Sequence, residues 1–89
     1  MTVCVALIRG INVGRAKRIA MAELRDMVEG LGHENVRTLL NSGNVVFDAK
    51  RAKTARIALD LRKGIEERFG IGAHVVVVTA AELRAAIDE

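Results

Sequence analysis

Strand-length apolar runs and amphipathic helical stripes alternate along this chain, and their order restricts the fold. Residues 3–8 and 75–78 are apolar at every position, which is typical of strands buried on both faces of a sheet. Two further strands are predicted over residues 36–40 and 45–47. Two helical stripes lie between these strands, each with apolar residues on one face and charges on the other. The apolar positions of the two stripes are Met21, Leu24, Met27, Val28 and Leu31, and then Ile57, Leu61, Ile65 and Phe69.

The residues between these elements are typical of caps and turns. Gly32 and Gly70 follow the two helical stripes, where a residue able to adopt the left-handed conformation commonly ends a helix. Residues 41–44, Asn-Ser-Gly-Asn, predict a tight turn between the second and third strands. Thr54 is predicted to cap the second helix, and residues 79–82 fit a capping box that starts a third.

The resulting order predicts a ferredoxin-like βαββαβ fold of the α+β class. It consists of a four-stranded antiparallel sheet with two helices on one face, plus the start of a third helix. Residues 1–79 form this unit, and residues 80–89 begin a C-terminal helix leading to a missing second half or a partner contact. Because the first and fourth strands are apolar on both faces, we expect the second sheet face to be covered. A homodimer or a C-terminal half would cover it.

Composition places the chain among ordinary globular proteins. Its 89 residues suffice for one domain, and no apolar run approaches the ~18 residues needed to cross a membrane. The single cysteine, Cys4, cannot form an internal disulfide, and the N-terminus reads as a strand instead of a signal peptide. We therefore expect a cytoplasmic protein. The net charge of +3 permits contact with anions.

Several motifs, in order and at matching spacing, resemble those of the DUF1697 family. They are the segments Leu-Ile-Arg-Gly-Ile-Asn-Val-Gly over residues 7–14, Met-Ala-Glu-Leu over 21–24, Val-Arg-Thr over 36–38 and Asn-Ser-Gly-Asn-Val-Val-Phe over 41–47. A looser match covers residues 79–84. The resemblance implies a bacterial α+β protein without an assigned activity, of which this chain looks like the N-terminal half. Asn41 stands where the family usually has Gln, and Arg15 where a second Gly is common.

A candidate site follows from the topology. The first two strands are parallel, so the loop after the first and the turn after the second lie at one edge of the sheet. Basic side chains, amide groups, glycines and the start of the first helix meet there, and together they favour an anion. The candidate ligand-binding residues are Arg9, Gly10, Asn12, Gly14, Arg15, Lys17, Asn41, Ser42, Gly43 and Asn44. His74, at the start of the fourth strand, is expected near the same edge.

The best interpretation is a module that binds a small anion or phosphate ligand at this edge, and two alternatives stay open. One is acylphosphatase-like phosphate hydrolysis, in which Arg9 would hold the phosphate and Asn41 would position water, by analogy with other small ferredoxin-like proteins. The other is a structural or oligomerisation domain that binds no ligand. Whether the chain is an enzyme is therefore left open.

Other chemistries have less support in the sequence. Gly10 and Gly14 fit neither the phosphate-binding P-loop nor the dinucleotide motif, and no cofactor is expected. His33 and His74 are placed at opposite edges of the sheet, so no metal site is expected. Nucleic acid is not favoured, because Phe47 is the sole aromatic residue in the central strands. The basic segment over residues 50–53, with nearby Arg56, lies at the edge opposite the first loop.

Overall fold

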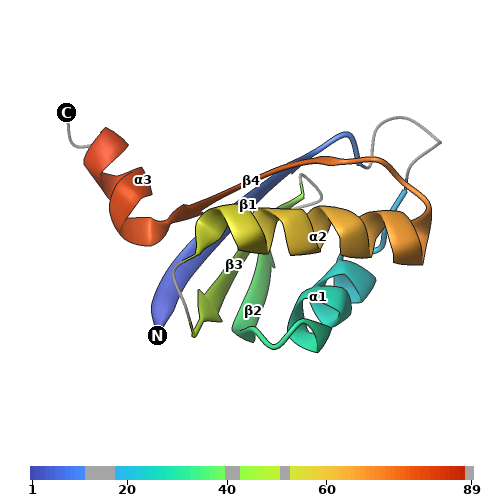
Figure 1. Ribbon diagram of the computed structural model, residues 1–89, viewed down its shortest axis with the longest axis horizontal. Helices are drawn as coiled ribbons and strands as arrows, with labels where there is room; N and C mark the ends of the chain where they lie inside the picture. Colours follow the sequence, from blue (N-terminus) through green and yellow to red (C-terminus); the bar gives the residue numbers. More distant parts are fainter. Residues whose placement is uncertain (12–17, 40–42, 51–52, 88–89) are drawn as a thin grey trace.

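A computed structural model describes residues 1–11, 18–39, 43–50 and 53–87 of the chain. The predicted anion-binding loop after the first strand and the predicted turn over residues 41–44 therefore lie partly outside these ranges. Along the described chain the elements are β1 (Thr2–Arg9), α1 (Met21–Gly30), β2 (Glu34–Leu39), β3 (Asn44–Ala49), α2 (Thr54–Phe69), β4 (His74–Thr79) and α3 (Ala80–Ile87) (Figure 1).

The four strands form one antiparallel sheet in the order β2-β3-β1-β4. β1 and β3 are the central strands, and Ala6 of β1 lies opposite Val45 of β3 and Val77 of β4. This order, with helices between β1 and β2 and between β3 and β4, confirms the ferredoxin-like α+β fold that the sequence predicts.

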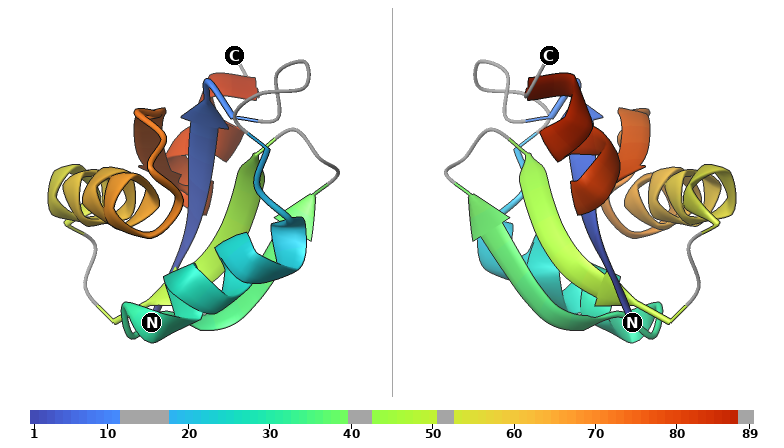
Figure 2. Two further views of the ribbon diagram at one scale, coloured as in Figure 1. Left: turned by 90° about the vertical axis from the view of Figure 1, so that its right-hand side faces the viewer. Right: turned by 90° about the vertical axis from the view of Figure 1, so that its left-hand side faces the viewer.

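One face of the sheet carries α1 and α2 and holds the hydrophobic core (Figures 1 and 2). Side chains alternate between the two faces of a strand, so every second residue of β1 and β3 points into this core. The fully buried large side chains include Phe47 and Ile8 from the sheet, Leu24 from α1 and Leu61 from α2. The predicted helical stripes therefore face the sheet, as their spacing requires.

The predicted end of α2 and the predicted start of α3 are confirmed, whereas the predicted cap of α2 is wrong. Gly70 ends α2 in the left-handed conformation, with φ of 69°. At α3, the Thr79 and Glu82 side chains each bond the other residue's backbone N–H at 3.1 Å, which confirms the capping box. The second helix starts at Thr54, as predicted, but the prediction that Thr54 is its cap is wrong. Thr54 is the first helical residue, and the cap position falls on Lys53, which makes no side-chain cap hydrogen bond. No helix in the described part of the chain is long and apolar enough to cross a membrane.

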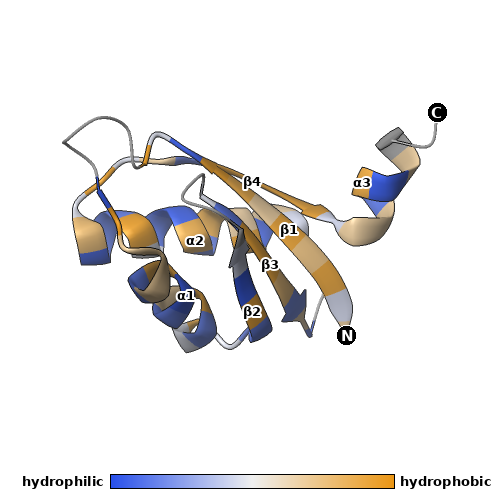
Figure 3. Ribbon diagram, turned by 180° about the vertical axis from the view of Figure 1, so that it is seen from behind, coloured by the Kyte–Doolittle hydropathy of each residue, from blue (hydrophilic) through white to orange (hydrophobic). Residues whose placement is uncertain are grey.

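The second face of the sheet, on the side of β1, β3 and β4 turned away from α2, carries an apolar patch, and we call it the open face. Figure 3 shows that apolar residues dominate β1 and β4 along their length. Val3 and Val76 are about two-fifths exposed on it, at 40% and 42%. By strand alternation and pairing, the apolar side chains on the open face are Val3, Val5, Leu7, Val46, Val76 and Val78. Polar side chains on the same face include Arg9, Asn44, Asp48 and His74.

Candidate functional site

The sheet edge where β1 ends, here called the loop edge, brings together part of the predicted site. Arg9 lies directly opposite His74 in the pairing of β1 with β4, and Leu7 lies opposite Asn44 in the pairing with β3. Gly43 has φ of +87°, and a Cβ atom built on it would lie 2.6 Å from the carbonyl oxygen of Ile8. Gly43, directly before β3, therefore packs against the end of β1.

Strand alternation decides which way the loop-edge side chains point. Arg9 and His74 share a face with Leu7 and Asn44, because paired residues in an antiparallel sheet project to the same side. That side is the open face. Arg9 and His74 are both exposed, whereas Asn44 is half-buried. Gly10, with φ of +89°, follows Arg9.

The remaining predicted site residues lie outside the part of the chain that the structure describes. They are Asn12, Gly14, Arg15, Lys17, Asn41 and Ser42. The loop-edge site therefore rests on Arg9, Gly10, Gly43 and Asn44, with His74 beside them.

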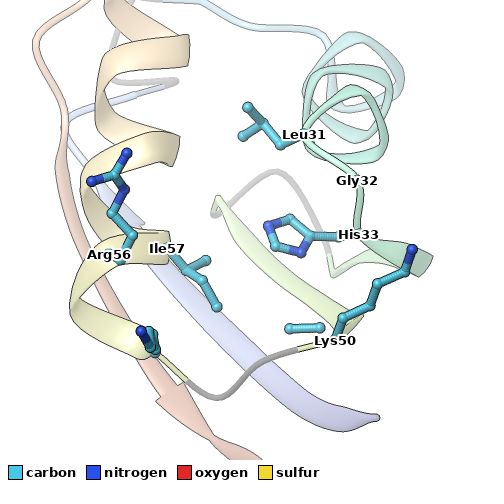
Figure 4. Close-up of a pocket in the computed structure, with 8 residues that line it drawn as sticks. Leu31, Gly32, His33, Lys50, Arg56 and Ile57 are labelled. Atoms are coloured by element: carbon cyan, nitrogen blue, oxygen red, sulfur yellow. The ribbon is translucent and has the colours of Figure 1, made fainter.

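A pocket of about 510 Å³ lies at the opposite edge of the sheet, where α1 ends, β3 ends and α2 begins (Figure 4). We call it the basic pocket. Its described lining residues are Leu31, Gly32, His33, Ala49, Lys50, Lys53, Arg56 and Ile57. Figure 4 shows the Leu31, His33 and Ile57 side chains directed into the space between α1 and α2, with Lys50 and Arg56 on opposite sides of it.

Three cationic side chains line the basic pocket: Lys50, Lys53 and Arg56. All three residues are exposed, and none of the described lining residues is a carboxylate. Arg56 bonds Asp60 one turn along α2, with 3.3 Å between Nε and Oδ1, but both partners are well exposed and such a pair is weak. The first turn of α2 adds backbone N–H groups and the positive end of the helix dipole. The pocket therefore offers a positive environment.

His33 forms one wall of the basic pocket. Its ring packs on the buried Phe47 ring, with 4.5 Å between the ring centroids and 37° between the planes. Burial lowers the pKa of His33 below its ordinary value of 6.5, and the nearby Asp60 carboxylate opposes that effect. The imidazole is consequently neutral at neutral pH, and the positive charge in the pocket comes from Lys50, Lys53 and Arg56.

Nucleophilic and metal chemistry find no support among the described residues. Cys4 is buried within the core, and burial, followed by the carboxylates of Glu82 and Asp48, raises the pKa of its thiol above 9.0. A protonated, inaccessible thiol is a poor nucleophile. Within the described ranges, no three His, Cys, Asp or Glu side chains are placed to hold a metal ion.

Sequence reasoning missed the basic pocket, although both of its signals were visible. The basic segment over residues 50–53 and His33 were each placed at the edge opposite the first loop. Considered separately, they suggested only a weak nucleic-acid contact and an isolated histidine. The structure joins them with Leu31 and Ile57 into one cavity.

Comparison with known proteins establishes the family. No curated protein matches the chain significantly. Among solved structures, the chain is similar to the conserved bacterial protein SP0830 from Streptococcus pneumoniae, with 30% sequence identity and a TM-score of 0.86. The match covers 99% of this chain and 48% of that one, so this chain spans about half the length of its structural relative. The family model described as "Protein of unknown function (DUF1697)" matches residues 1–89, and the chain therefore belongs to the DUF1697 family.

Proposed function

We propose that the chain is a binding module for a small anionic ligand and that the ligand occupies the basic pocket. The observation that carries the proposal is that Lys50, Lys53 and Arg56 all line one concave, partly apolar cavity. Ligand sites are commonly cavities of about 300–1,000 Å³ with apolar walls and a few polar groups. The basic pocket, at about 510 Å³, has that size and that composition.

Loss of lysine charge in the pocket tests this proposal. The double variant K50Q/K53Q removes two pocket cations, and R62Q/K63Q removes two cations from the exposed side of α2 as a matched control. Thermal unfolding is followed with phosphate, methyl phosphate, pyrophosphate and acetate. A ligand present at ~100 times its dissociation constant adds about 2.7 kcal/mol of stability. We expect an anion to raise the melting temperature of the wild type and of R62Q/K63Q, but not that of K50Q/K53Q.

An equal response in the two double variants would mean that the anions act through net charge and not through the pocket. The absence of any anion-induced stabilisation in the wild type would refute anion binding by this chain. Both variants lose the same formal charge, so nonspecific electrostatic effects cancel in the comparison.

The loop edge is a second candidate for the anion site. The observation in its favour is that Arg9, Asn44 and His74 project to the same side of the sheet, beside the close contact of Gly43 with Ile8. An anion held there would lose affinity in the Arg9→Ala variant and keep it in K50Q/K53Q. Acylphosphatase-like hydrolysis belongs to this candidate, and it requires phosphate release from an acyl phosphate that is lost in the Asn41→Ala variant.

The open face supports a separate proposal, that it packs against a second folded unit. Its support is the exposure of two valines, Val3 and Val76, on neighbouring strands within the apolar patch of that face. A second copy of the chain would give a dimer whose mass, measured by sedimentation equilibrium, falls to that of the monomer in the Val76→Lys variant. If the wild type is a monomer, a second copy does not cover the open face, and the proposal is then that a further half of a longer protein covers it. The free, buried thiol of Cys4 suits a reducing, cytoplasmic setting, which we include in the proposal.

A further inference from the structure

We propose that the anion bound in the basic pocket is a phosphate monoester whose substituent is an apolar ring. This inference rests on the proposed function, because it names the chemical class of the ligand for the same pocket. It is carried by a feature that anion binding alone does not require, namely the apolar wall beside the cations.

The volume of the pocket exceeds what a phosphate group needs. A volume of about 510 Å³ lies within the range of about 300–1,000 Å³ found for sites that hold drug-sized ligands. A phosphate group, with about five heavy atoms, fills only a minor part of such a cavity. The rest of the volume is available to the ester substituent.

The apolar wall is composed of Leu31, Ala49 and Ile57. Ala49 and Ile57 are buried, with 1% and 7% of their surfaces exposed, whereas Leu31 remains 42% exposed. An exposed leucine that points into a cavity gains free energy when an apolar group covers it, at about 25 cal/mol for each Å² removed from water. Leu31, directly after α1, and Ile57 of α2 both reach into the cavity (Figure 4). A ring between them would cover the exposed surface of Leu31 and pack against the small part of Ile57 that is not yet buried.

His33 favours a ring over a second charged group in this part of the cavity. The stacking on Phe47 fixes its imidazole against the core, and burial keeps that imidazole neutral at neutral pH. A neutral flat ring is a suitable neighbour for another flat ring, whereas it offers no charge to a second anion. The cations, by contrast, come from the end of β3 and the first turn of α2, where a phosphate dianion would lie.

Two esters with the same headgroup test the inference. Methyl phosphate and phenyl phosphate share one dianionic phosphate and differ only in the substituent. Isothermal titration of the 89-residue chain should give phenyl phosphate an affinity at least about tenfold higher, since the phenyl ring buries apolar surface that a methyl group cannot reach. In the Leu31→Ser variant that ratio should fall to about threefold or less, while the affinity for methyl phosphate stays within about twofold of wild type.

Leu83 provides the matched control. It is a similarly exposed leucine, at 37%, and lies on α3 away from the pocket, so the Leu83→Ser variant should keep the full ratio. Because Leu31 and Leu83 are both exposed, neither substitution opens a cavity in the core. Circular dichroism checks that each variant is folded.

Each result then decides between the two claims. Equal affinity for both esters in the wild type overturns the ring inference and leaves anion binding intact. A phenyl preference that persists in Leu31→Ser overturns the assignment of the ring to this wall. If neither ester binds at millimolar concentration, the ring inference fails, and the proposed function fails with it when phosphate, pyrophosphate and acetate also give no stabilisation.

Discussion

At the scale of single residues, Gly43 shows how the backbone holds the loop edge together. Its φ of +87° is readily adopted by glycine alone, and the space for a Cβ is already filled by the Ile8 carbonyl oxygen and the Ile11 side chain. Both features follow from the docking of the turn onto the end of β1. Gly43 is therefore a structural requirement of the fold, whatever the loop edge binds.

The Gly43→Ala variant should lose about 2 kcal/mol or more of unfolding free energy, because the new methyl group meets both a positive φ and a fixed carbonyl oxygen. Urea denaturation measures this loss. Gly30→Ala is the control: no atom lies within 4 Å of its Cβ position and its φ is not positive, so this variant should be as stable as wild type or slightly more so. Equal stability of the two variants would contradict the close packing at Gly43.

His33 gives the fold a dependence on pH. Its pKa is lowered in the folded state, so the unfolded chain takes up a proton near pH 6.5 before the folded chain does. The contribution of His33 to stability is thus complete above pH 6.5 and is lost as the pH falls through the folded-state pKa. Unfolding free energy should decrease between pH 7.5 and 5.5 in the wild type, and decrease less in His33→Gln.

The other histidine is the control for that measurement. His74 is exposed at the loop edge, far from Phe47, and His74→Gln should keep the wild-type decrease in stability. If instead the pH dependence disappears in His74→Gln and persists in His33→Gln, the burial of His33 against Phe47 is not its source.

At the scale of elements, local signals in the sequence predicted most of the fold. Continuous apolar runs predicted the strands, and apolar residues spaced about four positions apart predicted the helices. Each pattern reflects side chains that are buried in the fold. The Thr54 cap failed because a threonine near a helix start satisfies the same local pattern whether it sits at the cap or one residue inside. At α3 the prediction held, because Thr79 and Glu82 make a reciprocal pair with fixed spacing.

Because Thr79 belongs to a capping box and Thr54 does not, replacing each by alanine should affect hydrogen exchange differently. Thr79→Ala removes the hydroxyl that accepts the Glu82 N–H and should cost about 1 kcal/mol, seen as faster hydrogen exchange of α3 amides. Thr54→Ala is the matched control on α2, where the residue is not the cap, and exchange of α2 amides should change little. Unchanged α3 exchange in Thr79→Ala would show that the capping box does not hold this helix.

At the scale of the whole molecule, the two edges of the sheet explain why one candidate site could be predicted from the sequence and the other could not. The loop edge could be inferred from the sequence because its loop and turn directly follow parallel strands. The basic pocket combines the end of α1, the end of β3 and the start of α2. His33 and Lys50 are far apart in the sequence and lie at the same pocket only because the strands pair and both helices pack on the sheet. No local sequence pattern predicts that a space remains between the two helices.

The open face is also a property of the whole molecule. Its apolar character could be inferred from β1 and β4, which are apolar on both sides, and the exposure of Val3 and Val76 agrees with that inference. The sequence of the strands does not distinguish between the two units that could cover this face. A second copy and a further half of a longer protein would bury the same valines.

The most direct test of the central claim is an ¹⁵N–¹H NMR titration of the chain with phenyl phosphate. Binding in the basic pocket should move the backbone amide signals of Gly32, His33, Lys50 and Lys53 together, along one saturating curve. The amides of Gly10 and Gly43, at the loop edge, should remain in place. Movement confined to the loop-edge amides, or no saturable movement at all, would contradict the account.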